Sequence, residues 1–189
     1  MAKLPEYVLT RLRFMVIDDD PHMRSMVINI LRSFGVREIE EAEDGESAFE
    51  RLKDFSPDIV FCDWQMGPMD GLAFTRRIRG NADSSGAFVP LIMITAHTEV
   101  GRVCTARDSG ITEFLAKPIS ATTLYARICA VINRPRPFIR AKSFVGPDRR
   151  RRRDPYQAGK ARRQEDQVAV KESGVDVSQD DIDKMLAGL

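Results

Sequence analysis

The chain has 189 residues, of which 43% are hydrophobic and 30% charged, proportions typical of a soluble globular protein. No run approaches the roughly 18 apolar residues of a membrane span, residues 1–10 lack the apolar core of a secretory signal, and three cysteines form no disulfide scaffold, so we expect a reduced, cytoplasmic protein. The net charge of +1 divides into −4 for residues 1–133, +10 for 134–163 and −5 for 164–189, which predicts three regions of different character.

Apolar runs alternate with amphipathic stretches along residues 10–133. The apolar runs predict buried strands at 12–17, 59–62 and 91–94, with weaker strands at 37–41 and 114–116. Helical spacing of apolar residues predicts helices at about 21–34, 45–53, 71–79, 98–108 and 121–132. Capping residues stand at the expected starts: Asp20, Asp44, Asp70, Thr98 and Ser120. Five successive β-α units predict an α/β domain with a doubly wound, five-stranded parallel sheet.

The periodicity stops after Asn133. Residues 134–176 form a basic segment rich in proline and arginine, which predicts a largely disordered linker. Residues 177–189 carry apolar side chains at i, i+3, i+4 and i+7, which predicts a short amphipathic helix with one apolar stripe: Ile182, Met185, Leu186 and Leu189. Ser178 stands at its N-cap position.

Polar residues follow four of the predicted strands. Asp18 and Asp19 follow the first strand, Asp63 the third, Thr95 the fourth and Lys117 the fifth. Because parallel strands end at one edge of the sheet, we expect these side chains to converge there. Clustered carboxylates suit Mg²⁺, and a cation beside a lysine and a hydroxyl suits a phosphoryl group, with Asp63 as its acceptor. Taken singly, each residue would read as a helix cap or a surface charge.

These residues lie in motifs that resemble the receiver domain of bacterial response regulators. The motifs are MVIDDD (15–20), FCDWQMGPMDG (61–71), MITAH (93–97) and FLAKP (114–118), and EEAEDGESA (40–48) resembles the CheY-like chemotaxis branch. The resemblance covers residues 10–133. It implies a flavodoxin-like receiver fold in which Asp63 accepts phosphate from a histidine kinase.

The resemblance also implies roles for the neighbouring residues. Asp19, Asp63 and the backbone carbonyl of Gln65 would hold Mg²⁺, with Asp18 acting through water. Thr95 and Lys117 would contact the phosphoryl group, and the Lys117–Pro118 bond would be cis. Phe114 matches the switch residue, often a tyrosine in the chemotaxis branch; phenylalanine cannot make the hydroxyl contact that tyrosine makes with a partner. His97 would flank the acceptor.

The leading hypothesis is therefore a two-component response regulator, a signalling switch rather than an enzyme, in chemotaxis or motility. One alternative is a receiver adaptor that responds to cyclic di-GMP. Another is a Mg²⁺-dependent phosphohydrolase, although haloacid-dehalogenase-like enzymes place their nucleophile on the first strand. A transcription factor that reads specific DNA sequences is not expected, because residues 134–189 hold no DNA-binding motif.

The basic segment contains five successive arginines: Arg149, Arg150, Arg151, Arg152 and Arg153. A flexible polybasic linker, nucleic acid binding and attraction to anionic lipid remain open readings. Guanidinium groups also bind phosphates bidentately and stack on bases. The segment resembles the arginine-rich extensions by which some chemotaxis-type regulators bind cyclic di-GMP.

The C-terminal segment 177–189 resembles the peptide by which the flagellar motor switch protein binds a phosphorylated chemotaxis regulator. The resemblance implies that this chain carries both a receiver and a copy of a receiver's ligand. We expect the tail to dock on the fourth helix, fifth strand and fifth helix of its own receiver, a second copy or another regulator, and phosphorylation of Asp63 to strengthen this contact. The tail would then compete with the motor switch or drive self-association. A frayed acidic tail is the alternative.

Overall fold

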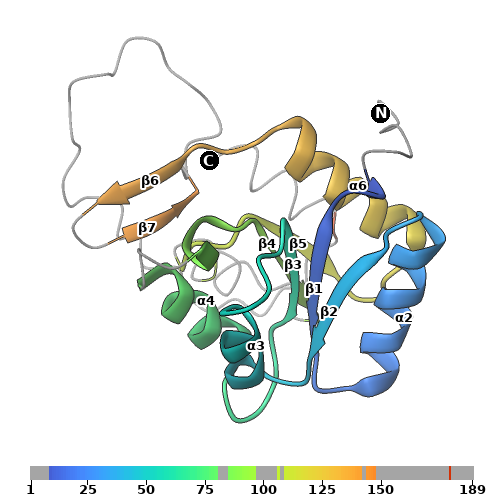
Figure 1. The fold of residues 1–189 in the computed structure, drawn as a ribbon, viewed down its shortest axis with the longest axis horizontal. Helices are drawn as coiled ribbons and strands as arrows, with labels where there is room; N and C mark the ends of the chain where they lie inside the picture. The colour runs from blue at the N-terminus through green and yellow to red at the C-terminus, as the bar shows by residue number, and fades with distance from the viewer. Residues whose placement is uncertain are drawn as a thin grey trace.

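The computed structural model describes residues 9–80, 85–96, 106, 109–141, 144–147 and 179. Five parallel strands form one sheet in the order β2-β1-β3-β4-β5 (Figure 1). Their bounds are β1 Arg13–Ile17, β2 Glu38–Ala42, β3 Ile59–Asp63, β4 Leu91–Thr95 and β5 Glu113–Ala116. The sequence-based prediction of a doubly wound, flavodoxin-like parallel sheet is thereby confirmed.

The described helices follow the strands as expected. They are α2 Pro21–Ser33, α3 Gly45–Arg51, α4 Gly71–Gly80 and α6 Ala121–Asn133, with a 3-10 turn η1 at Ser85–Phe88. None of the helices within these described ranges is long and apolar enough to cross a membrane. The helix expected at 98–108 lies outside the described residues, except for Ala106, which is buried.

The predicted caps account for where several helices begin. The carboxylate of Asp20 accepts from the backbone N–H of His22 at 2.8 Å, and Asp70 accepts from Ala73 N–H at 2.6 Å. Capping boxes join Asp44 with Ser47 in α3 and Ser120 with Thr123 in α6. These side chains satisfy N–H groups that lack helical partners, so local sequence fixes where the helices begin.

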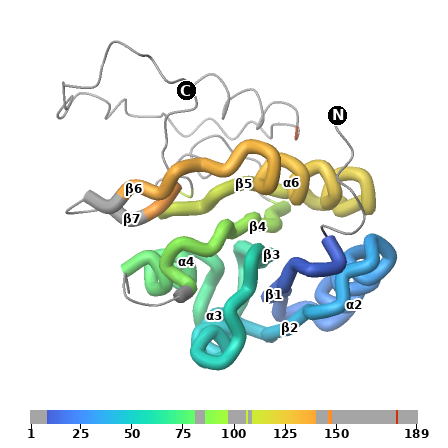
Figure 2. The backbone as a smooth tube through the Cα atoms, turned by 45° about the horizontal axis from the view of Figure 1, so that its top comes forward, coloured from blue at the N-terminus to red at the C-terminus, as the bar shows by residue number. Residues whose placement is uncertain are grey.

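The sheet is covered on both faces because successive strand residues point to opposite sides. Phe14 and Val16 of β1 are buried in the layer that includes α2 and α6, whereas Met15 and Ile17 are buried in the layer that includes α3 and α4. Figure 2 shows the sheet between these pairs of helices. The carboxyl ends of β1, β3 and β4 remain available for polar residues.

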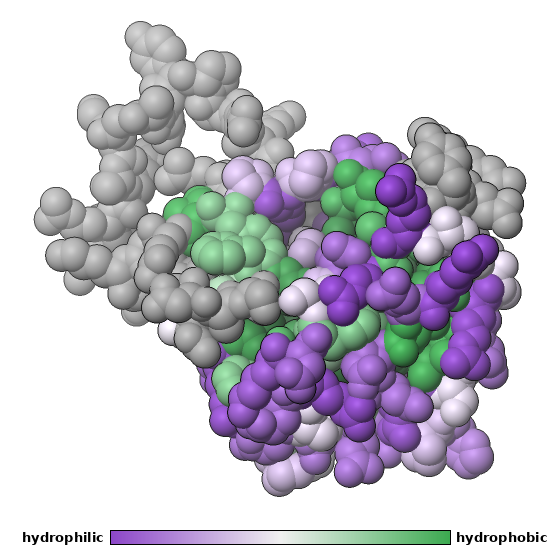
Figure 3. Space-filling view, viewed as in Figure 1, coloured by the Kyte–Doolittle hydropathy of each residue, from purple (hydrophilic) through white to green (hydrophobic). Residues whose placement is uncertain are grey.

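The expected linker contains an antiparallel hairpin, β6 Phe138–Ala141 and β7 Phe144–Pro147. The prediction of a linker without regular structure therefore differs from the structure over these residues. The ring of Phe138 packs edge-on against Phe88 with centroids 5.8 Å apart, and Figure 3 shows hydrophobic surface beside the hairpin, with a largely hydrophilic surface over α3. Packing on the domain, which no local pattern signals, accounts for the hairpin.

Arg79 of α4 is buried beneath this hairpin. Its guanidinium donates to the carbonyls of Gly86, Ala87, Val89 and Gly110 at 2.8–3.3 Å and lies 5.0 Å from the centroid of the Phe138 ring. Burial lowers the pKa of Arg79 to about 9, so the group still carries its proton at neutral pH. The side chain thus ties α4, η1 and the hairpin together.

Candidate functional site

Three carboxylates meet at the carboxyl ends of β1 and β3. Asp18 and Asp19 follow β1 directly, and Asp63 is the last residue of β3. One carboxylate oxygen from each lies within 4.8 Å of the others. Asp18 and Asp63 are buried, whereas Asp19 is exposed. The convergence expected from the strand order is therefore present, and the cluster has one side open to solvent.

The electrostatics of Asp18 favour a cation here. Burial, and then the neighbouring charge of Asp63, raises the pKa of Asp18 to about 6. Its Oδ1 accepts from Asp20 N–H at 2.9 Å, but its buried Oδ2 has no hydrogen-bond partner within the described part of the chain. A buried oxygen without a partner beside two further carboxylates fits a hard divalent cation such as Mg²⁺.

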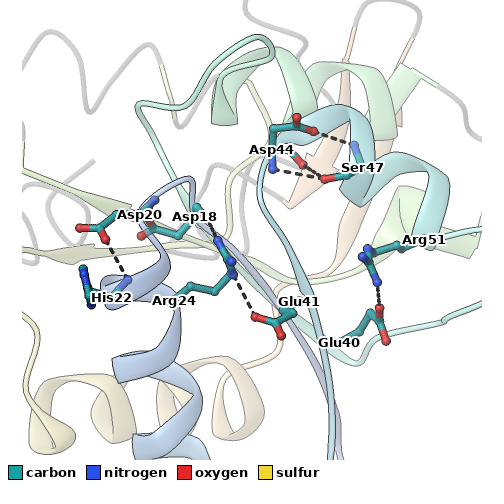
Figure 4. Close-up of polar contacts among 9 residues, drawn as sticks. All are labelled: Asp18, Asp20, His22, Arg24, Glu40, Glu41, Asp44, Ser47 and Arg51. Atoms are coloured by element: carbon teal, nitrogen blue, oxygen red, sulfur yellow. Dashed lines mark hydrogen bonds and ion pairs between the residues drawn. The ribbon is translucent and has the colours of Figure 1, made fainter.

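An arginine holds the backbone of Asp18 in place. Arg24 donates from Nη1 to the backbone oxygen of Asp18 at 2.7 Å and from Nε to Glu41 at 2.9 Å (Figure 4). The guanidinium thus joins the end of β1 to β2. Because it binds the carbonyl and not the carboxylate, it fixes the position of Asp18 while leaving its Oδ2 open.

Lys117 supplies the cationic side of the site. Its Nζ lies 2.8 Å from Asp63 Oδ1, and its backbone N–H donates to the carbonyl of Thr95 at 2.8 Å. Thr95 is buried at the end of β4. The Lys117–Pro118 bond is cis, as the resemblance implied, and Gly67–Pro68 is a second cis bond, which was not predicted from the sequence.

The loop between β3 and α4 packs closely against both the side chain and the backbone of Asp63. Gln65 N–H donates to Asp63 Oδ2 at 3.2 Å, and Gly71 N–H donates to Trp64 O at 3.0 Å. A Cβ on Gly71 would lie 2.3 Å from the carbonyl oxygen of Asp63, so only glycine fits there. This role was not predicted from the sequence; a glycine directly after the Asp70 cap is the signal that would have pointed to it.

An open depression of about 490 Å³ adjoins the carboxylates, lined by Asp19, Trp64, Gln65, Met66 and Asp70. The lining residues follow β1 and β3 in the chain. A charged group that approaches Asp19 would therefore pass through this depression. Three side chains of the lining are polar, which suits a hydrated cation or an anionic donor held by one.

The remaining site predictions fall in two places. Phe114 is 1% exposed on β5 and packs in the cluster that includes Ala106. The other residues lie outside those that the structure describes: His97, Arg149, Arg150, Arg151, Arg152, Arg153, Ile182, Met185, Leu186 and Leu189.

Fold and site together define a flavodoxin-like domain with an acidic cluster and a lysine at the carboxyl ends of its sheet. Residues 14–129 match the response regulator receiver domain family. The chain therefore belongs to the response regulator receiver family, whose members are signalling proteins rather than conventional enzymes.

Individual relatives agree with this assignment. The chemotaxis protein CheY-3 of Vibrio cholerae is 32% identical over 123 residues, covering 65% of this chain and 93% of the relative. A solved CheX–CheY–BeF₃–Mg²⁺ complex from Borrelia burgdorferi is similar at 26% identity and a TM-score of 0.59, covering 64% of this chain and 89% of that one.

A second solved structure bears on the metal. The receiver domain of the sensor histidine kinase PA1611 from Pseudomonas aeruginosa is 26% identical with a TM-score of 0.58, covering 65% of this chain and 98% of that one. That domain has a magnesium ion coordinated in its active-site cleft. The chain is thus a receiver with chemotaxis relatives, and its acidic cluster is consistent with a phospho-acceptor site.

Proposed function

We propose that Asp63 is the phosphoacceptor of a Mg²⁺-dependent switch whose donor is a histidine kinase. The observation that carries the proposal is the placement of Asp63 between two further carboxylates, within 4.8 Å, and the Nζ of Lys117, at 2.8 Å. An oxygen of Asp63 forms the new P–O bond while the P–N bond to the donor imidazole breaks and its electron pair leaves with the nitrogen.

Asp18, Asp19, Asp63 and the backbone carbonyl of Gln65 would hold Mg²⁺, with Asp18 acting through water. When bound, Mg²⁺ would neutralise phosphoryl oxygens during the transfer. The buried Oδ2 of Asp18, for which the described residues supply no hydrogen-bond partner, supports this assignment, because such an oxygen needs a proton, a water or a cation. Arg24 holds the Asp18 backbone and so preserves the arrangement.

Lys117 and Thr95 are the proposed phosphoryl-contacting residues. A phosphoryl group on Asp63 adds about 1.5 to 2 negative charges near neutral pH, and the Lys117 ammonium already lies against this carboxylate. Because the backbone N–H of Lys117 donates a hydrogen bond to Thr95 O, a movement of one residue would be transmitted to the backbone of the other. Phe114, which pairs with Met93 on the neighbouring strand, is the proposed switch residue.

The surface around β5 and α6 is the proposed output face, with a protein of the chemotaxis or motility system as its target. The relatives named chemotaxis proteins support this pathway. Candidate targets are the flagellar motor switch and another receiver. Since phosphorylation acts at the ends of β4 and β5, this face is the part of the surface that would sense it first.

Phosphate labelling of the purified full chain tests the acceptor. Acetyl phosphate with Mg²⁺ should label the wild type, and Asp63→Asn should lose the label because an amide is not a nucleophile. Asp54→Asn is the matched control, since Asp54 is exposed after α3, and should label normally. Label retained on Asp63→Asn would assign the acceptor to another residue.

A further inference from the structure

The outer edge of β5 is engaged by a residue from the far end of the chain. β5 is the last strand of the sheet, with β4 beside it on one side. On the other side, the side chain of Gln179 accepts from Ala116 N–H at 2.6 Å through Oε1 and donates to Phe114 O at 3.4 Å through Nε2. These partners are 63 and 65 residues away in sequence.

The two hydrogen bonds reproduce the pattern of an added parallel strand. In a parallel pair, one residue donates its N–H to the carbonyl of residue i−1 and accepts from the N–H of residue i+1 on its neighbour. Gln179 makes these two bonds around Leu115, with a side-chain amide in place of a backbone N–H and C=O. Its carboxamide therefore occupies the position of one residue of a sixth strand.

A second side chain binds the backbone directly before β5. Arg136 Nη1 donates to Thr112 O at 3.4 Å. Thr112, Phe114 and Ala116 thus each have a side-chain partner from beyond α6. Exposed strand edges invite pairing with other chains, and proteins commonly cover them; here the cover comes from the chain itself.

We propose that Gln179 is a built-in cap of the β5 edge, whose side chain occupies in cis the place of a partner that would add a strand there. The cap goes beyond the phosphorylation chemistry and does not depend on it. It also lies next to the site, because Ala116 directly precedes Lys117, whose Nζ contacts Asp63. A partner that pairs with this edge must first displace Gln179.

The exchange rate of the Ala116 amide hydrogen tests the cap directly, measured by NMR on the ¹⁵N-labelled full chain without Mg²⁺ or phosphodonor. Loss of its acceptor in Gln179→Ala should speed Ala116 exchange by about tenfold or more. Gln179→Asn, one methylene shorter, should behave like alanine. Gln167→Ala, a change of the same kind in the same region of the sequence, should leave the rate unchanged.

An unchanged Ala116 rate in Gln179→Ala would overturn the proposal. Dilution of the wild type separates an internal cap from one supplied by a second copy: protection that is independent of protein concentration supports the cis arrangement, and protection lost on dilution overturns it. Because no phosphoryl group is present, failure here is distinguishable from failure of Asp63 labelling.

Discussion

At the scale of single residues, the carboxylates of the site repel one another, and burial adds to the cost of ionising Asp18. Asp18 is 1% exposed and lies among carboxylates, and its raised pKa records the cost of keeping it ionised there. Lys117 balances Asp63 directly, which leaves Asp18 as the carboxylate with least compensation. A bound cation therefore stabilises these carboxylates more than it would stabilise an exposed cluster.

Removing the charge of Asp18 should stabilise the metal-free protein. Asp18→Asn takes one buried charge away from Asp63, so we expect the melting temperature without Mg²⁺ to rise by about 3–6 °C, equivalent to about 1–2 kcal/mol in a domain of this size. Millimolar Mg²⁺ should raise the melting temperature of the wild type and have little effect on the variant. Thermal unfolding followed by circular dichroism measures both.

The control for this change is Asp54→Asn, which removes an exposed carboxylate and should change the melting temperature little under either condition. A lower melting temperature for metal-free Asp18→Asn would contradict the account of Asp18 as a destabilising charge.

At the scale of elements, the start of α4 is fitted against the end of β3. Gly71 opens α4 with its N–H bonded to Trp64 O, and an added Cβ would also meet the sulfur of Met93 at 3.0 Å. Since Asp63 O would be 2.3 Å away, a larger residue must push the helix from the strand that carries Asp63. The site and the helix therefore share one packing constraint.

Gly71→Ala should lower the free energy of unfolding by about 1–3 kcal/mol, the usual cost of overpacking a closed contact. It should also slow labelling by acetyl phosphate, because the Asp63 backbone must move. Urea denaturation and the labelling rate are the measurements.

Gly80→Ala is the matched control at the other end of α4. Among the described residues, no heavy atom outside the adjoining backbone of α4 lies within 4 Å of a Cβ at this position, so we expect a change of no more than about 0.5 kcal/mol. Because alanine has the higher helix propensity of the two residues, helix propensity cannot account for a loss of stability, and equal destabilisation by the two substitutions would show that the contact with Asp63 is not its cause.

At the scale of the whole molecule, the segment after α6 is partly integrated with the receiver. The hairpin packs on α4 and η1 through Phe138, which contacts both Phe88 and the Arg79 guanidinium. Gln179 engages β5 on another part of the same domain. Arg136 adds a further contact by donating to Thr112 O. The described residues beyond Asn133 thus contact the domain at several places, and Gln179 does so on β5, which belongs to the proposed output face.

Phe138→Ala should lower the free energy of unfolding by about 1–2 kcal/mol, because an edge-on aromatic pair and a cation–π contact are lost together with apolar burial. Ile139→Ala is the control: Ile139 is 40% exposed, and its loss should cost no more than about 0.5 kcal/mol. Urea denaturation of both full-length variants measures the difference. If they unfold alike, the Phe138 contacts do not anchor the hairpin.

The strands, the starts of the described helices and the edge of the sheet at which the acidic residues meet could all be predicted from the sequence. These features follow from local rules: apolar periodicity gives the elements, capping residues such as Asp44 and Ser120 give their starts, and parallel strands place their carboxyl ends together. Asp18, Asp19 and Asp63 could therefore be grouped before any distance was known.

The single contacts that follow no sequence period became known only from the folded structure. The fit of Gly71 against Asp63 O, the four carbonyls around Arg79 and the pairing of Gln179 with β5 depend on atoms brought together by folding. None has a sequence period, because each is a single contact and not a repeated one. Periodic patterns record which face a residue buries; they do not record which distant backbone group it meets there.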